Sequence, residues 1–216
     1  MISLKIILLT LIFAVPVFSQ QSKLSQAVNY LSEFISSQHF RDLKKSNSDL
    51  ALVDTIYLRA ANYENHNYSE TLLALTFTTV PYNKVPIVIP FFKLIVDYPL
   101  TSADDSIYLL KNRDLPKSFL YDSPGNKFGD KDKLAHFFGS AFLSYSTLFL
   151  DLSGLIGYFV EVFEQDFKVQ SSIDSRDLFV DGLGAQFGKL LRKDKTILPS
   201  QIFAVINSSF VRYNFP

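Results

Sequence analysis

Residue types able to do chemistry gather in one stretch of this chain, from Asp130 to Leu191. An imidazole next to a carboxylate can act as a general base, with the carboxylate orienting the ring. The stretch holds one histidine and several carboxylates that suit such a role, and the candidate catalytic residues are His136, Glu161, Asp177 and Asp181. Three polar residues near its start are candidates for ligand binding: Asp132, Lys133 and Ser140. The two lysines near the helix start, Lys131 and Lys133, are placed where they could meet a phosphate.

Two roles are open for these side chains if they meet in the fold. In the first, a small hydrolase or transferase acts on a lipid-linked envelope substrate, with His136 as base and Asp177 or Asp181 orienting it. In the second, the same groups hydrogen-bond across helices and fix their register. No nucleophile motif, glycine-rich phosphate loop or H-x-x-x-H pair accompanies them, which favours the second role. The sequence assigns no metal ligand and identifies no cofactor or small-molecule ligand.

Three helices are expected to position these residues, because apolar residues recur there at steps of three and four. Their predicted bounds are Lys131–Leu150, Ser153–Phe167 and Ser175–Leu191. In each helix small and polar residues share one side, while leucine and phenylalanine occupy the other. Stripes of glycine, serine and alanine are typical of close helix packing. We therefore expect the small stripes to face one another and the aromatic faces to meet lipid or other apolar protein.

The order of these motifs resembles a known family. The segment DK-x-x-HFFGSAFL begins at Asp132, a glutamate and an aspartate follow at Glu161 and Asp166, and D-x-x-x-D-x-x-G-A-x-x-G ends at Gly188. This pattern is similar to the YfiM-like family of periplasmic lipoproteins and, more distantly, to the VanZ-like membrane proteins. The resemblance implies an α-helical, membrane-associated module of bacterial envelopes, with a VanZ-like branch linked to glycopeptide resistance. The chain departs from the lipoprotein pattern because it has no cysteine to carry a lipid.

The N-terminus has the pattern of an export signal. Lys5 lies in a short first region, an apolar run extends from Ile6 to Val15, and a small residue, Ser19, precedes the polar residue Gln20. We expect cleavage after Ser19; the alternative is an uncleaved membrane anchor, for which the apolar run is short. The predicted location is the periplasm, in association with the inner or the outer membrane.

The composition limits the range of partners. Lys+Arg and Asp+Glu both number 21, so no net charge favours binding to nucleic acid. Hydrophobic residues make up 48% of the chain and phenylalanine alone contributes 21 residues. This apolar load favours a membrane or an envelope protein as partner. Without cysteine the exported chain must fold by packing alone.

The remaining segments predict a fold that is mainly α with a small β part. Residues Gln21–Gln38 have the pattern of an amphipathic helix, whereas Leu50–Tyr63 is ambiguous between helix and strand. The segment Leu72–Leu100 is rich in β-branched residues, with prolines between its apolar runs, and predicts two or three strands of an antiparallel ribbon, one of them at Thr76–Val80. We divide the chain into a signal (1–19), a helix and ribbon region (20–129), a helical module (130–192) and a C-terminal arm (193–216) that joins the ribbon as a strand or in extended form.

Overall fold

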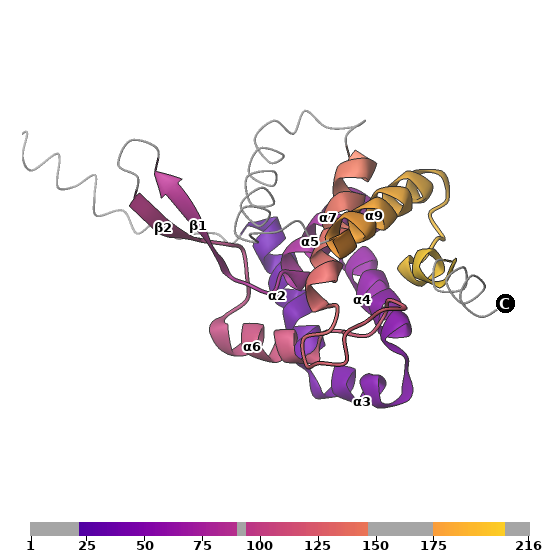
Figure 1. Ribbon diagram of the computed structural model, residues 1–216, viewed down its shortest axis with the longest axis horizontal. Coiled ribbons are helices and arrows are strands. Elements are labelled where there is room, and N and C mark those ends of the chain that lie inside the picture. Colours follow the sequence, from indigo (N-terminus) through magenta and orange to yellow (C-terminus); the bar gives the residue numbers. More distant parts are fainter. Residues whose placement is uncertain (1–21, 90–93, 147–174, 206–216) are drawn as a thin grey trace, which may run out of the picture.

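The described part of the chain folds as a bundle of helices with a two-stranded ribbon (Figure 1). The computed structural model describes residues 22–89, 94–146 and 175–205. Within these ranges the prediction of a mainly α fold with a small β part is confirmed. The predicted export segment and the predicted helix Ser153–Phe167, which includes Glu161, lie outside the described residues.

The centre of the bundle is helix α5 (Tyr68–Thr79). Its residues 71–79 are all buried, and it packs against α2 (Lys23–Ser36), α4 (Asp49–Tyr63) and α7 (Lys131–Ser146). The prediction of a strand at Thr76–Val80 was wrong, since residues up to Thr79 are helical.

Two physical effects explain this error. A helix that is buried all round lacks the apolar and polar faces that mark an amphipathic helix in a sequence. In addition, threonine disfavours helices partly because its hydroxyl competes for the hydrogen bonds of the backbone. Here the hydroxyls instead donate to backbone carbonyls one turn earlier. Each of three threonines donates to the carbonyl oxygen four residues earlier, at 2.9 Å for Thr71, 2.8 Å for Thr76 and 2.9 Å for Thr79.

Serine side chains set the boundaries of the N-terminal helices. The Ser22 hydroxyl accepts the N–H of Ser25 at 3.1 Å and caps α2. Ser37 ends α2 in an extended conformation and caps the next helix, α3 (Gln38–Ser46). The predicted N-terminal helix is thus confirmed but ends slightly earlier than expected. The ambiguous segment Leu50–Tyr63 is helix α4, capped by Ser48.

The ribbon consists of β1 (Lys84–Ile89) and β2 (Leu94–Pro99), which pair antiparallel with Val85 opposite Tyr98. It extends away from the helices in Figure 1. In a two-stranded ribbon each strand has one outer edge that is not paired with another strand. A proline on such an edge costs no hydrogen bond between strands, so a ribbon of this kind can contain prolines. Helix α6 (Asp105–Asp114) follows the ribbon and packs against α2.

The chain beyond α9 (Ser175–Lys193) is helical at 199–205. The predicted C-terminal strand that joins the ribbon was therefore wrong for the described part of this segment. The reason is the burial of Phe203, whose ring lies 4.6 Å from that of Phe137 and 5.2 Å from that of Phe119. The segment returns to the bundle core instead of the ribbon.

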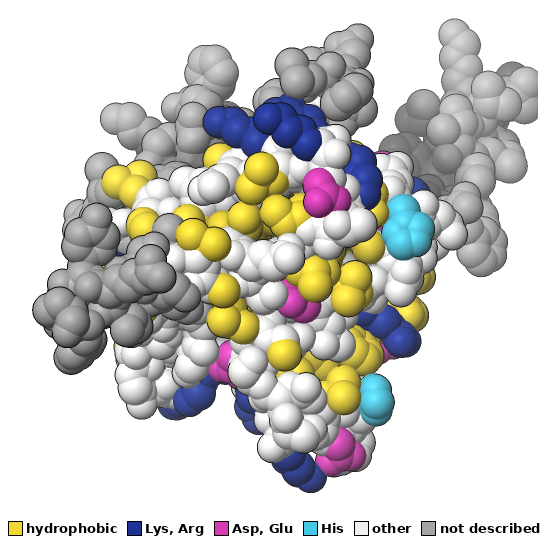
Figure 2. Space-filling model, turned by 90° about the vertical axis from the view of Figure 1, so that its right-hand side faces the viewer, with side chains coloured by type: hydrophobic (Ala, Val, Ile, Leu, Met, Phe, Trp, Pro, Cys, Tyr) yellow, Lys and Arg dark blue, Asp and Glu magenta, His cyan; other side chains and the backbone are white. Residues whose placement is uncertain are grey.

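The surface on the right-hand side of Figure 1 is mixed. Figure 2 shows this face, on which hydrophobic side chains form separate patches with charged groups between and around them. Among the described residues, no helix combines the length and the apolar character needed to cross a bilayer.

One lysine is buried where α6 meets the end of α5. The ammonium of Lys111 donates to the carbonyl oxygen of Val80 at 3.1 Å and lies 5.0 Å from the centre of the Tyr108 ring. Burial, with a smaller contribution from Lys131, lowers the pKa of Lys111 to about 7. The folded protein therefore releases this proton at a lower pH than the unfolded chain does.

Replacing Lys111 should change how stability depends on pH. Between about pH 7 and pH 10.5 the unfolded chain binds more protons at this lysine, so the free energy of unfolding rises with pH, by at most about 1.4 kcal/mol per pH unit. We expect Lys111→Met to flatten this rise in urea unfolding measured from pH 7 to pH 9. The exposed Lys189→Met serves as control. An equal rise in both variants would contradict the prediction.

Candidate functional site

Helices α7 and α9 touch backbone to backbone. A Cβ atom at Gly184 would lie 2.1 Å from the carbonyl oxygen of Phe137, and one at Gly188 would lie 2.4 Å from that of Ala141. The predicted small stripes on these two helices do face each other. We call this contact, with the polar side chains along it, the α7–α9 seam. Opposite the seam, the aromatic face of α7 packs into the protein's own core. Of the two expected environments, lipid or other apolar protein, this face therefore has the second.

A buried ion pair lies at one end of the seam. Lys133 Nζ is 2.5 Å from Asp177 Oδ1, and both side chains are almost fully buried. The same ammonium lies 2.8 Å from Asp132 Oδ2, at the edge of the bundle. Removing one member of a buried pair leaves an uncompensated charge in a medium of low polarity, which is strongly destabilising. The pair therefore fixes how α9 begins against α7.

His136 lies between two carboxylates. Its Nδ1 atom is 3.3 Å from Asp181 Oδ1, within reach of a hydrogen bond, whereas its Nε2 atom is 3.6 Å from Asp177 Oδ1, which is too far for one. Ser140 donates its hydroxyl to Asp181 Oδ1 at 2.8 Å. One turn further along, Ser144 donates to the carbonyl oxygen of Ala185 at 2.8 Å. The polar groups of the seam thus bond across the two helices.

The structure brings six of the seven predicted site residues together. They are Asp132, Lys133, His136, Ser140, Asp177 and Asp181. The seventh, Glu161, lies outside the described residues. Within the described ranges no group of three or more histidine and acidic side chains is arranged to hold a metal ion.

Near Ser140 this arrangement opens onto a hollow in the surface. Ser140 and Asp181 line a shallow hollow of about 600 Å³, and the Asp181 side chain is 22% exposed. His136 and Asp177 are buried behind them and do not line the hollow. A molecule in the hollow would therefore meet a serine hydroxyl and a carboxylate first, and the imidazole only through Asp181. This geometry permits proton transfer through the Asp181–His136 pair, but it keeps the imidazole itself out of direct contact with a substrate in the hollow.

A second ion-pair group was missed at the sequence level. Asp130 is buried and accepts the N–H groups of Phe119 and Leu120 at 3.3 and 3.2 Å, together with the Ser123 hydroxyl. Its other oxygen lies 2.5 Å from Arg176 Nη2. Asp130 therefore ties the loop before α7 to the first turn of α9.

Arg176 completes this group. It forms two further bonds to Asp122, at 2.9 and 3.0 Å. Burial alone would lower the pKa of Arg176, but the hydrogen bonds to Asp122 and Asp130 outweigh it and raise that pKa above its ordinary value. The sequence signal was the aspartate at the end of a turn-rich loop, which is also typical of a simple helix cap. Its pairing with Arg176 could not be inferred because the two residues lie 46 positions apart in the chain.

Comparisons with protein families, with characterised proteins and with solved structures find no match to this chain. The function must therefore be argued from the geometry of the molecule.

The close contact of the seam can be tested with two neighbouring glycines. In Gly184→Ala the added methyl group would collide with the Phe137 carbonyl and force the helices apart, so we expect this variant to lower the free energy of unfolding by about 2 kcal/mol. Gly182 has no atom within 4 Å of a built Cβ and is exposed, so Gly182→Ala should be neutral or stabilise by up to about 1 kcal/mol. Urea unfolding of both variants measures the difference. Equal stability would show that the helices are not held at this distance.

Proposed function

We propose that this protein is a structural or adaptor component of the bacterial cell envelope, exported to the periplasm and held at a membrane surface by its ribbon. The exposed apolar side chains of β2 are the observation that carries the proposal. The export pattern at the N-terminus and the motif resemblance to the YfiM-like family support the same location.

Every residue of β2 is exposed, although most of them are apolar. Leu94, Val96 and Tyr98 alternate along the strand and share one side of the ribbon, while Ile95, 71% exposed, lies on the other. Contiguous exposed apolar groups mark a surface that binds a partner or a membrane. A narrow ribbon with apolar groups on both sides suits insertion into a membrane interface, which surrounds it, better than a flat protein surface, which would cover one side.

The paired state of the seam supports a structural role for its polar groups. Among the described residues, Lys133 and Asp177 bond each other, and Ser140 and His136 both reach Asp181. Satisfied polar networks in a buried setting fix a single packing arrangement. In this proposal the bundle is a rigid body that carries the ribbon.

The ribbon hypothesis predicts binding to uncharged vesicles. Exposing a serine in place of Ile95 removes about 1.5 kcal/mol or more of apolar transfer energy, so Ile95→Ser should weaken association with phosphatidylcholine vesicles about tenfold. Leu178, 55% exposed on α9, provides the matched control Leu178→Ser, which should bind as the unchanged protein does. Vesicle co-sedimentation measures both.

The opposite results are equally clear. The role of the ribbon would be overturned if the wild-type protein does not sediment with the vesicles. It would also be overturned if Leu178→Ser loses as much binding as Ile95→Ser does. If the protein instead co-purifies with one envelope protein and Ile95→Ser abolishes that contact, the ribbon docks a protein partner.

A second candidate function follows from the hollow at the end of the seam. There Ser140 and Asp181 meet the surface, with His136 behind Asp181. In this alternative the group acts as the acid–base site of a hydrolase or transferase on a lipid-linked substrate, with Asp181 exchanging protons with the ring. The surface hollow beside a histidine–carboxylate pair is the specific observation that favours it.

Two isosteric variants separate the candidates. Asp177→Asn removes the charge that balances buried Lys133, so we expect a loss of about 2–3 kcal/mol in the free energy of unfolding. Asp181 is partly exposed, so Asp181→Asn should keep near-normal stability. In a strain that lacks the protein, a structural role predicts that Asp181→Asn restores envelope integrity and Asp177→Asn does not. A folded Asp181→Asn protein that fails to restore it would favour the enzyme.

A further inference from the structure

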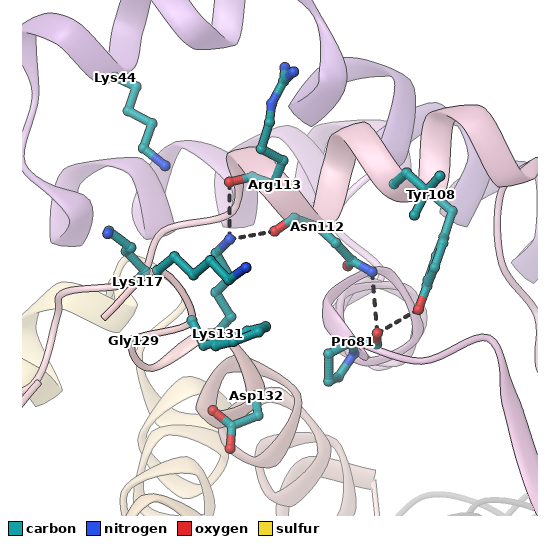
Figure 3. Close-up of a pocket in the computed structure, with 12 residues that line it drawn as sticks. Lys44, Pro81, Tyr108, Asn112, Arg113, Lys117, Gly129, Lys131 and Asp132 are labelled. Carbon is teal, nitrogen blue, oxygen red and sulfur yellow. Dashed lines mark hydrogen bonds between the residues drawn. The ribbon is translucent and has the colours of Figure 1, made fainter. Parts of the chain in front are cut away.

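A cleft of about 940 Å³ lies beside the first turn of α7, between α6, the end of α3 and the loop that leads into α7. Its lining includes four lysines from three parts of the chain: Lys44, Lys117, Lys127 and Lys131. Figure 3 shows the Lys131 ammonium directed at the backbone carbonyls of Asn112 and Arg113, with Lys44 and Lys117 on the same side. Side chains that are distant in sequence thus gather positive charge around one cavity.

These lysines are held by neutral acceptors. Lys131 Nζ donates to the carbonyl oxygens of Asn112 and Arg113 at 2.6 and 3.0 Å. Lys44 Nζ donates to those of Asp114 and Leu115 at 2.9 and 3.1 Å. An ammonium group has three N–H donors. Among the described residues, each of these two lysines therefore has one donor left for another acceptor. Carbonyl groups position these cations without cancelling their charge.

Two carboxylates near the cleft, those of Asp114 and Asp49, act on these lysines but form their own bonds to other groups. Asp114 pairs with Arg41 and Arg113, at 3.3 and 2.8 Å, and the Arg113 guanidinium turns away from Lys131 in Figure 3. Asp49 accepts the backbone N–H groups of Lys117 and Ser118 at 2.8 and 2.7 Å.

One carboxylate, that of Asp132, lines the cleft itself, and it accepts the ammonium of Lys133 at 2.8 Å. The balance of charge in the cleft is therefore positive. Burial lowers the pKa of Lys131, the charges of Lys44 and Lys117 lower it further, and those of Asp114 and Asp49 oppose this only in part. Burial also lowers the pKa of Lys44. A bound anion would relieve both effects.

The shape of the cleft is fixed by its loop. Gly129 has φ +58°, and a Cβ there would lie 2.1 Å from the carbonyl oxygen of Lys117. The Asn126 side chain accepts the N–H groups of Phe128 and Gly129, both at 2.8 Å. These contacts bring Lys117 and Lys127 to the same cavity before any ligand binds. Preorganised donors lose little freedom on binding.

Two exposed apolar side chains also line the cleft. Leu109 is 66% exposed and Phe128 is 68% exposed, and the Lys127 ammonium lies 5.3 Å from the centre of the Phe128 ring. A cationic cavity with apolar groups beside it matches a phosphate attached to an apolar body. Inorganic phosphate compounds would meet the same lysines without using these two side chains.

We propose that this cleft binds a phosphate group through Lys44, Lys117, Lys127 and Lys131. The phosphate is either the headgroup of an anionic lipid or part of a free phosphorylated molecule. The inference does not rest on the proposed role of the ribbon, because the cleft acts by charge and the ribbon by apolar contact.

The test compares two pairs of charge-neutralising substitutions in the full exported protein. Lys117→Gln with Lys127→Gln removes two cleft cations, whereas Lys45→Gln with Lys193→Gln removes two exposed lysines outside the cleft. Lys44 and Lys131 are left in place because each ammonium group holds two backbone carbonyls, whereas that of Lys117 makes one longer bond, to the carbonyl oxygen of Asn126 at 3.3 Å. The probes are pyrophosphate, followed by calorimetry, and phosphatidylglycerol vesicles, followed by co-sedimentation. Phosphatidylcholine vesicles report the ribbon alone.

The cleft pair should weaken binding about tenfold or more, and the control pair by less than about twofold. Loss of both probes supports a phosphate site of general specificity. Loss of vesicle binding alone identifies a lipid headgroup, and loss of pyrophosphate binding alone identifies a free phosphorylated ligand. The proposal is overturned if the unchanged protein binds neither probe more tightly than the cleft pair does, or if both pairs lose binding equally. Unchanged binding to phosphatidylcholine in the cleft pair separates this result from failure of the ribbon hypothesis.

Discussion

The absence of side chains at Gly184 and Gly188 is the constraint on which the described fold depends. Because carbonyl oxygens of α7 occupy the space that Cβ atoms would fill, the two helices meet without a layer of side chains between them. At that separation polar groups on facing turns come within bonding distance and are shielded from water. The ion pair of Lys133 with Asp177 and the bond of Ser140 to Asp181 follow from this approach. Larger residues at the glycines would leave the same polar groups apart and hydrated.

The parts of the fold that the sequence predicted well are those where helical periodicity separates two kinds of side chain. The stripe of Asp177, Asp181, Gly184 and Gly188 is visible in one dimension because residues three and four apart share a face. The same reasoning failed at Thr76–Val80, where every side is buried and the pattern carries no direction. It failed again near Phe203, since local propensity does not show which distant surface will bury a given apolar side chain.

The candidate site divides along similar lines. Residues on α7 and α9 that were expected to meet do so, because each lies on a stripe whose partner stripe could be recognised. The ion-pair group of Asp130 with Arg176 and the gathering of Lys44, Lys117 and Lys127 beside Lys131 could not be foreseen. Both depend on a loop whose path is set by side chain to backbone bonds, such as those of Asp49 to Lys117 and Ser118. Sequence patterns describe repeating geometry, and these contacts do not repeat.

The seam and the cleft are adjoining parts of one electrostatic system. Asp132 lines the cleft and accepts the ammonium of Lys133, and that ammonium also bonds Asp177 in the seam. A charge placed in the cleft therefore acts on a carboxylate that is one contact away from the buried pair. Buried charges interact more strongly than hydrated ones. The interaction of a charge in the cleft with Asp132 and Lys133 is therefore strongest on the buried side, toward α9. The first turn of α7 thus joins a surface that attracts anions to the contact that holds the bundle together.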